Sequence, residues 1–162
     1  IIEKTNKELG TEYTVDDIPD WVLPPEMERY FEEPGFFRDL LPVEGAQKYL
    51  KMLYEDGHKI IIATASAKNA ILDKINNLTE LFPFLRDEDI IPISQKHLLL
   101  GDIMLDDGLH NIKVSKCKYP IIMDAPWNRR KWAENYGRVH SWEEFYNFVV
   151  EVASIEADKE VV

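Results

Sequence analysis

Hydroxyl side chains follow a run of isoleucines in the middle of the chain. The stretch Ile60-Ile61-Ile62-Ala63-Thr64-Ala65-Ser66 is apolar until it reaches Thr64 and Ser66. An α/β protein commonly ends a buried strand at the edge of the sheet where ligands bind. Hydroxyl groups and the free amides at the start of the next helix can donate hydrogen bonds to an anion. We therefore predict that Thr64 and Ser66 face a bound anion. The alternative for Ser66 is a cap of the following helix.

A second apolar run ends in two carboxylates. The stretch Gly101-Asp102-Ile103-Met104-Leu105-Asp106-Asp107 follows Lys96 closely in the sequence. An ammonium group can neutralise a phosphoryl oxygen, and one or two carboxylates with water and phosphate are the ligands that Mg²⁺ takes. The alternatives are a solvated lysine and an ordinary Asp-Asp-Gly turn. Together with the hydroxyl groups, Lys96, Asp106 and Asp107 predict a phosphate site with a magnesium ion.

The composition restricts the kinds of partner. The 162 residues carry 19 basic and 30 acidic side chains, a net charge of -11 that opposes contact with a polyanionic backbone. No run approaches the roughly 20 apolar residues of a membrane span. A single cysteine, Cys117, excludes an intrachain disulfide. We expect one cytoplasmic domain that binds neither nucleic acid nor membrane. A homo-oligomer is compatible with the sequence.

Apolar spacing predicts an α/β fold that would position these residues. Spacing of three and four predicts helices over 1–9, 44–56, 67–78 and 141–152, and short Ile- and Leu-rich runs predict strands over 59–63, 90–93, 103–105 and 120–123. Strands of this kind alternating with helices are typical of a parallel sheet. Residues 11–33 are rich in acidic, proline and aromatic residues, which indicates a lid of short helices, and we expect residues 1–41 to form this cap region. Residues 42–162 would form the core.

The ordered set Thr64, Lys96 and Asp106-Asp107 resembles the hydroxyl, lysine and acidic motifs of the haloacid-dehalogenase-like (HAD-like) phosphatases, and among them the 5'(3')-deoxyribonucleotidase family. The stretch Pro34-Gly35-Phe36-Phe37-Arg38-Asp39-Leu40 resembles that family's junction between cap and core, and Arg138-Val139-His140-Ser141-Trp142 its approach to the last helix. The resemblance implies a Rossmann-like parallel sheet with a small helical cap near the N-terminus. It also implies a Mg²⁺-dependent hydrolase of nucleoside or deoxynucleoside monophosphates, acting through a phosphoaspartate.

The resemblance also assigns roles to residues. Thr64 and Lys96 would hold the phosphoryl group, with Ser66 beside them, and Asp106 with Asp107 would hold Mg²⁺. Phe36 and Phe37 would stack on the nucleobase of the nucleotide, and the alternative for at least one of them is packing in the core.

One family motif is not found where it is expected. The family's first strand ends in Asp-x-Asp, whose first aspartate is the nucleophile and whose second is the general acid and base. Asp16-Asp17 follows Tyr13-Thr14-Val15 rather than a buried run, and indicates a helix start. In the family this strand comes first in the chain and lies in the sheet between the strands ending at Thr64 and Asp106. Its loss would leave two unpaired strand edges, so we expect it in a segment before Ile1. The alternative function is a non-catalytic nucleotide-binding or interaction module on the same fold.

The stretch Trp127-Asn128-Arg129-Arg130 follows the last predicted strand. It either contacts the phosphate or sugar of a substrate or forms a solvated basic turn.

Overall fold

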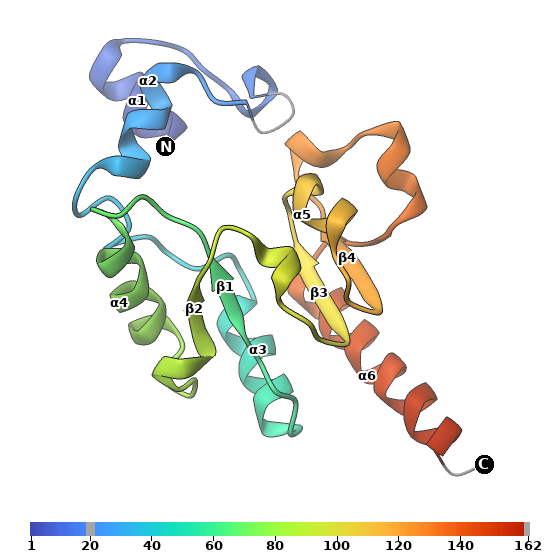
Figure 1. Ribbon diagram of the computed structural model, residues 1–162. Helices are drawn as coiled ribbons and strands as arrows, with labels where there is room; N and C mark the ends of the chain where they lie inside the picture. The colour runs from blue at the N-terminus through green and yellow to red at the C-terminus, as the bar shows by residue number, and fades with distance from the viewer. Residues whose placement is uncertain (19–21, 161–162) are drawn as a thin grey trace.

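The computed structural model describes residues 1–18 and 22–160 and shows a mixed α/β protein with parallel sheets, roughly half of it helical (Figure 1). The α-helices are α1 (Ile2–Leu9), α2 (Pro25–Glu28), α3 (Ala46–Glu55), α4 (Ile71–Leu81), α5 (Leu109–Val114) and α6 (Trp142–Glu160). The strands are β1 (Ile62–Thr64), β2 (Ile90–Pro92), β3 (Ile103–Asp106), β4 (Tyr119–Met123) and β5 (Gly137–Val139). The 3-10 helices are η1 (Val15–Asp17), η3 (Arg29–Glu32), η4 (Asp87–Asp89), η5 (Lys96–Leu98), η6 (Pro126–Asn128) and η7 (Lys131–Asn135).

The strands form two parallel sheets rather than one. In the first, β1 pairs with β2, and Thr64 lies opposite Pro92. In the second the order is β3-β4-β5, and Asp106 lies opposite Ile122. The strands β1 and β3 are therefore both edge strands, and no described strand pairs with their free edges. Because unpaired backbone amides and carbonyls are costly when buried, these two edges are sites where a further strand would be stabilised.

Helices α3 and α6 join the two sheets through shared packing. One core cluster is built around Leu53 of α3 and Phe145 of α6, and a second around Leu50 of α3. Ile60 and Trp142 pack against both clusters. The apolar contact between α3 and α6 thus holds the β1–β2 half and the β3–β5 half together.

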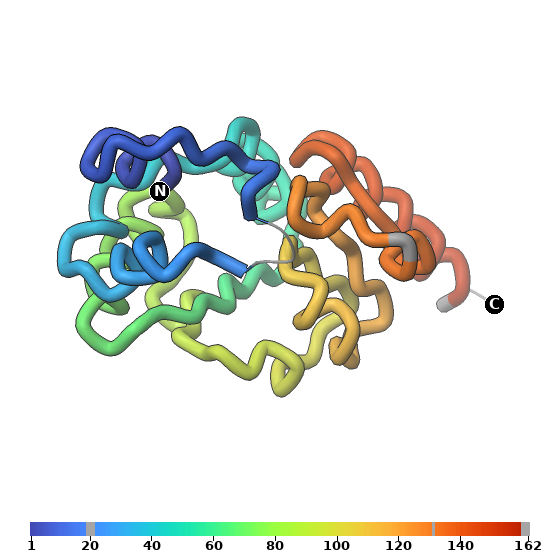
Figure 2. Tube along the Cα trace, turned by 90° about the horizontal axis from the view of Figure 1, so that it is seen from above, coloured from blue at the N-terminus to red at the C-terminus, as the bar shows by residue number. Residues whose placement is uncertain are grey.

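The N-terminal helices lie above α4 (Figure 1), and the N-terminal segment reaches across to the other half, where η1 contacts η6 (Figure 2). Helix α1 ends at Gly10, which takes the left-handed conformation that terminates helices (φ 66°). Asp73 on α4 accepts a hydrogen bond from the Arg38 guanidinium at 2.6 Å, and the Asn77 amide donates to the carbonyls of Arg38 and Leu40. Helix α4 therefore anchors the segment that leads from the N-terminal helices into the core.

Several sequence predictions are confirmed and others need correction. Strands β2, β3 and β4 lie within one residue of the predicted ranges, whereas α5 and β5 were not predicted. Helix α4 begins at Ile71 rather than at residue 67, and α6 continues to Glu160. The strand predicted over 59–63 is shorter and shifted, since β1 runs from Ile62 to Thr64, and Ile61 is 41% exposed.

A single sheet is also not what the structure contains: β1–β2 and β3–β5 are separate, since the described residues supply no strand between them. Within the described residues no helix is long and apolar enough to cross a membrane.

Candidate functional site

The carboxyl end of β1 places two hydroxyl groups in a largely closed environment. Thr64 is 6% exposed, and its carbonyl accepts a hydrogen bond from the Ile93 N–H at 2.9 Å, which fixes the strand end. The Ser66 hydroxyl oxygen is buried and has no hydrogen-bond partner among the described residues. Since α4 begins only at Ile71, Ser66 is not its cap. An unpaired buried hydroxyl is costly unless a ligand satisfies it.

Lys96 and Asp106 form the central ion pair of the site. Lys96 Nζ donates to Asp106 Oδ2 at 2.6 Å, and the two side chains are 20% and 5% exposed. The other carboxylate oxygen of Asp106 accepts hydrogen bonds from the Gly108 N–H at 2.7 Å and the Asn111 amide at 3.0 Å. Asp106 is therefore a well-anchored acceptor that sets the position of the Lys96 ammonium.

Asp107 is the carboxylate suited to a cation. Burial raises its pKa above the ordinary value of 3.8, and the charge of Asp106 raises it further. A nearby cation would reverse this rise, because it stabilises the charged form. Within the described residues no three His, Cys, Asp or Glu side chains are grouped as a complete metal site. Two carboxylates do fit Mg²⁺, which keeps waters and takes phosphate oxygens as its remaining ligands.

Lys74 is a functional candidate that sequence reasoning missed. It lies on α4, and its Nζ donates to the Ala65 carbonyl at 2.9 Å and stands 4.7 Å from the centre of the Phe37 ring. Burial lowers its pKa below 10.5, and the nearby charge of Lys96 lowers it further. One sequence signal of its partial burial is that Lys74 lies at helical spacing between the apolar residues Ile71 and Leu78 of α4. Two ammonium groups thus lie near the end of β1.

Phe36 and Phe37 belong to an aromatic cluster in the segment before α3. Their ring centres are 5.1 Å apart in an edge-to-face contact, and Tyr30 stacks on Phe36 at 5.9 Å. Phe37 is 5% exposed, whereas Phe36 is half-buried. Phe37 is therefore a packing residue that touches the site through Lys74, and of these two phenylalanines Phe36 has the more accessible ring.

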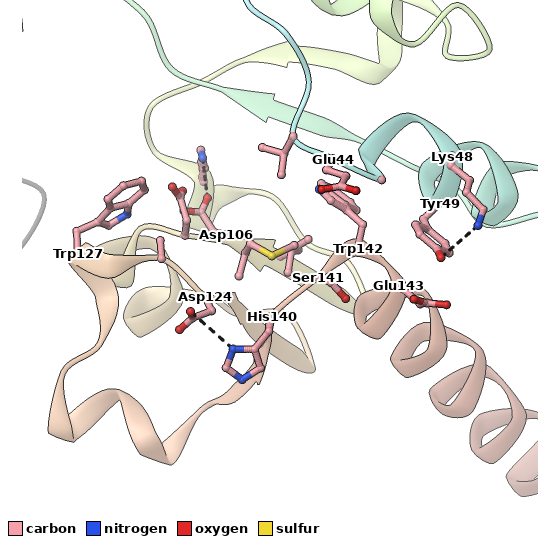
Figure 3. Close-up of a pocket in the computed structure, with 17 residues that line it drawn as sticks. Glu44, Lys48, Tyr49, Asp106, Asp124, Trp127, His140, Ser141, Trp142 and Glu143 are labelled. Carbon is pink, nitrogen blue, oxygen red and sulfur yellow. Dashed lines mark hydrogen bonds and ion pairs between the residues drawn. The ribbon is translucent and has the colours of Figure 1, made fainter. Parts of the chain in front are cut away.

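A cavity of about 1140 Å³ lies at the carboxyl ends of β3 and β4. Lys96, Asp106 and Asp107 line it, together with residues of the loop before α3 and the start of α6. Figure 3 shows Asp106, Asp124 and Trp127 facing this space, with Glu44 and Trp142 on its other side. The predicted residues Thr64, Ser66, Phe36 and Phe37 do not line it.

The loop after β4 is held by ion pairs and hydrogen bonds, although its Arg129 side chain is exposed. Asp124 accepts from Arg129 at 2.7 Å and from Arg138 at 2.6 Å, and chiefly the Arg129 contact holds its pKa below the ordinary value. Asn128 is fully buried, and its amide donates to the carbonyls of Asp107 at 3.0 Å and Met123 at 2.8 Å. This network connects the loop to the acidic motif, a contact that the spacing of the residues does not predict.

The chain contains one Asp-x-Asp triplet, Asp87-Glu88-Asp89, and it lies at the wrong end of the sheet. It precedes β2, whose first residue pairs with Ile62 at the start of β1. The Asp89 carboxylate is paired with Arg86 and Lys59. It cannot serve as the attacking group beside Thr64.

A protein-family model described as "5' nucleotidase, deoxy (Pyrimidine), cytosolic type C protein" matches residues 2–155. The 5'(3')-deoxyribonucleotidase of Bacillus subtilis (strain 168) is 34% identical over 109 residues, which are 67% of this chain and 62% of that protein. The 5'(3')-deoxyribonucleotidase of Bacillus phage SPbeta matches with the same identity and coverage. The matched region thus spans less than two thirds of these relatives.

Proposed function

This chain belongs to the 5' nucleotidase, deoxy (pyrimidine), cytosolic type C family, and on that premise we propose that it is a Mg²⁺-dependent hydrolase of nucleoside or deoxynucleoside monophosphates. The observation that carries the proposal is the contact between Lys96 and Asp106 beside the partly buried Asp107, whose pKa is raised. A cation and two carboxylates at strand ends suit a phosphate ester with a bound divalent ion.

We further propose that the two sheets are parts of one Rossmann-like parallel sheet of the HAD-like type, with residues 1–41 as the helical cap and 42–162 as the core. Three features support this arrangement: every strand pair is parallel, β1 and β3 have free edges, and α3 packs against α6. One added strand would join the sheets.

Four side chains would hold the phosphoryl group. Thr64 and Ser66 would donate hydroxyl hydrogen bonds, and the unpaired Ser66 hydroxyl would gain a partner in doing so. Lys96 would supply a fixed positive charge, because Asp106 orients its ammonium group. Lys74 would supply a second charge, since it is a partly buried cation that contacts the Ala65 carbonyl and the Phe37 ring. The half-buried ring of Phe36 is the candidate for stacking on the base.

Asp107 would bind Mg²⁺ directly, and Asp106 would complete the acidic pair. The bound ion would neutralise charge that develops on the phosphoryl oxygens. In this proposal the lysines and hydroxyls orient the phosphate, and the two aspartates bind the cation.

The resemblance assigns the attacking carboxylate to an Asp-x-Asp motif on a strand between β1 and β3. There its first aspartate would attack phosphorus to give a phosphoaspartate and release the nucleoside oxygen, which takes a proton from the second aspartate. Water would then hydrolyse the phosphoaspartate. Nucleophilic catalysis requires this group itself.

A non-catalytic nucleotide-binding module is the second candidate function. It is favoured by one observation: Asp106 already accepts three hydrogen bonds, so it is a poor nucleophile. The same lysines and hydroxyls would bind a nucleotide without cleaving it.

The two functions are separated by measuring phosphate release from deoxynucleoside 5'- and 3'-monophosphates with Mg²⁺. The chain would be assayed alone and with an apolar strand ending in Asp-x-Asp joined before Ile1, and an otherwise identical strand ending in Asn-x-Asn would be the control. Release by the Asp form alone supports the hydrolase. Nucleotide binding without release in every form supports the binding module.

A small nucleotide is the proposed partner and the cytoplasm the proposed location. The matched family is named for a cytosolic type of nucleotidase, and a chain with a single cysteine, which can form no intrachain disulfide, suits that reducing compartment.

A further inference from the structure

Asn128 has an unusual position for an asparagine in a loop. It is 0% exposed, and every hydrogen-bonding position of its amide is used. Its Nδ2 donates to the carbonyls of Asp107 at 3.0 Å and Met123 at 2.8 Å. Its Oδ1 accepts from the Ala125 N–H at 3.1 Å and from Arg138 at 2.6 Å. One side chain therefore connects the end of β4 to the residue that follows β3.

Arg138 on β5 holds Asn128 in this orientation. Its guanidinium donates to the Asn128 side chain, to the Asn128 carbonyl at 3.0 Å and to the Asp124 carboxylate at 2.6 Å. The Arg138 and Asp124 side chains are 20% and 11% exposed. Because a buried and fully satisfied polar network is rigid, the amide of Asn128 is a fixed donor toward Asp107.

We propose that Asn128 is a positioning residue whose amide, by holding the Asp107 carbonyl, sets the direction in which the Asp107 carboxylate meets a divalent cation. This inference rests on the proposed function, because it takes Asp107 as the Mg²⁺ ligand. Asn128 contacts the peptide of Asp107 and not the cation, so it acts through Asp107 alone.

The geometry gives a reason for such a device. Asp106 is held by Lys96, Gly108 and Asn111 through its side chain, whereas the contact that fixes Asp107 from another element is made to its backbone. The peptide orientation of Asp107 decides where its carboxylate points. Outer partners of this kind typically change metal affinity 10- to 100-fold when they are removed.

The test compares two asparagines of the same local chemistry. The amides of Asn128 and Asn77 each donate to two backbone carbonyls, but those bound by Asn77 belong to Arg38 and Leu40. Mg²⁺ affinity would be measured by calorimetry without nucleotide for the wild type, Asn128→Ala and Asn77→Ala, with a thermal melt of each. We expect the dissociation constant to rise 10- to 100-fold in Asn128→Ala. In Asn77→Ala we expect a lower melting temperature and an unchanged dissociation constant.

A second variant and a second readout cover the case in which Asn128→Ala does not fold. Asn128→Asp keeps the volume and the oxygen that accepts from Arg138, but it loses the donors to Asp107 and Met123, so its Mg²⁺ affinity should also fall. In the wild type, addition of Mg²⁺ should shift the NMR signals of the Asn128 side-chain amide and leave those of Asn77 unchanged.

The inference is overturned if the folded Asn128 variants bind Mg²⁺ with unchanged affinity. It is also overturned if the NMR signals of the Asn128 side-chain amide do not shift when Mg²⁺ is added. If the wild type binds Mg²⁺ with the expected dependence on Asn128, but the form that carries the added Asp-x-Asp strand releases no phosphate, the proposed hydrolase is contradicted and the inference stands. A wild type that binds no Mg²⁺ contradicts both.

Discussion

Lys96 and Asp106 join the two sheets at their carboxyl ends. Lys96 follows β2 of the first sheet, Asp106 ends β3 of the second, and 2.6 Å separates Nζ from Oδ2. Ile60, which packs against both core clusters, lies near the start of β1. The ion pair and Ile60 therefore connect the two sheets at opposite ends of their strands. The ion pair therefore has a structural and a proposed chemical role, and variants must separate the two.

Replacement of Lys96 by alanine should lower the stability of the chain and also the phosphate release of the form that carries the added Asp-x-Asp strand. Asp106 would keep its bonds to Gly108 and Asn111 but lose its cation, which we expect to cost about 1–3 kcal/mol. The double variant Lys96→Ala/Asp106→Asn should recover most of that stability without recovering nucleotide binding. Denaturant melts and phosphate release measure the two effects. Full activity in Lys96→Ala would remove Lys96 from the phosphate site.

Replacement of Asp107 by asparagine should abolish stabilisation by Mg²⁺. A ligand at 100 times its dissociation constant stabilises the folded state by about 2.7 kcal/mol, and this gain should be present in the wild type and missing in the variant. Asp102→Asn is the matched control, because Asp102 is exposed and precedes the same strand. Melting temperatures with and without Mg²⁺ give the result. An equal Mg²⁺ shift in wild type and Asp107→Asn would place the ion elsewhere.

An added methyl group at Gly108 should disturb the position of Asp106. A Cβ there would lie 2.8 Å from His110 Cε1, 2.9 Å from Asp106 Oδ1 and 3.1 Å from Asn111 Nδ2. We expect Gly108→Ala to cost about 1–3 kcal/mol, as overpacked sites do. Gly101→Ala is the control, since a Cβ at Gly101 meets no atom within 4 Å. Equal melting temperatures for the two variants would show that the loop adapts without strain.

Acid should weaken the fold partly through Asp89. Hydrogen bonds from Arg86 and Lys59 hold its pKa well below the ordinary value of 3.8. A carboxylate with a lowered pKa stabilises the fold fully above its unfolded pKa, and this contribution is lost as the pH falls below that value toward the folded pKa. The stability difference between wild type and Asp89→Asn should therefore be largest near neutral pH and shrink below about pH 4. Urea melts from pH 7 to pH 2 measure it, and a constant difference would contradict the assignment.

Two apolar residues of the central region should differ in their cost of truncation. The apolar run predicts that Ile61 lies in the middle of a buried strand, yet Ile61 is 41% exposed. Leu53 of α3 is 3% exposed. We expect Leu53→Ala to cost about 2–5 kcal/mol. Ile61→Ala should cost clearly less, because much of its side chain is already in contact with water. Denaturant melts decide between these ranks, and an equal cost would mean that Ile61 is covered in solution.

Patterns that depend on neighbouring residues were readable from the sequence. Strands β2 to β4 are short apolar runs, and Ser141 caps α6 by accepting from the Glu144 N–H at 3.1 Å, as the Ser-Trp-Glu-Glu pattern predicts. The strand β5 was missed because it is three residues long with arginine at its centre. Helix α5 was missed because it follows Asp-Asp-Gly, which also indicates a turn.

Some contacts of the candidate site could likewise be predicted from the sequence, and others could not. Lys96 and Asp106 were predicted to meet because parallel strands end at one edge, and the structure brings them into contact. Lys74 and Asn128 were not predicted, because their burial results from packing between elements far apart in the sequence. The remaining assignments, namely Thr64 and Ser66 for phosphate, Asp106 and Asp107 for Mg²⁺ and the 1–41 cap, stay predictions that the variants above can test.

The free edges of β1 and β3 also affect how the protein behaves at high concentration. Edge strands resist pairing with other molecules when they contain proline or lysine. The outer strand β2 contains Pro92, but β1 (Ile62–Thr64) and β3 (Ile103–Asp106) contain neither residue. An unpaired apolar edge of this kind is a template for intermolecular strand pairing, so when no further strand occupies these edges, the chain should self-associate through β1 and β3 as its concentration rises.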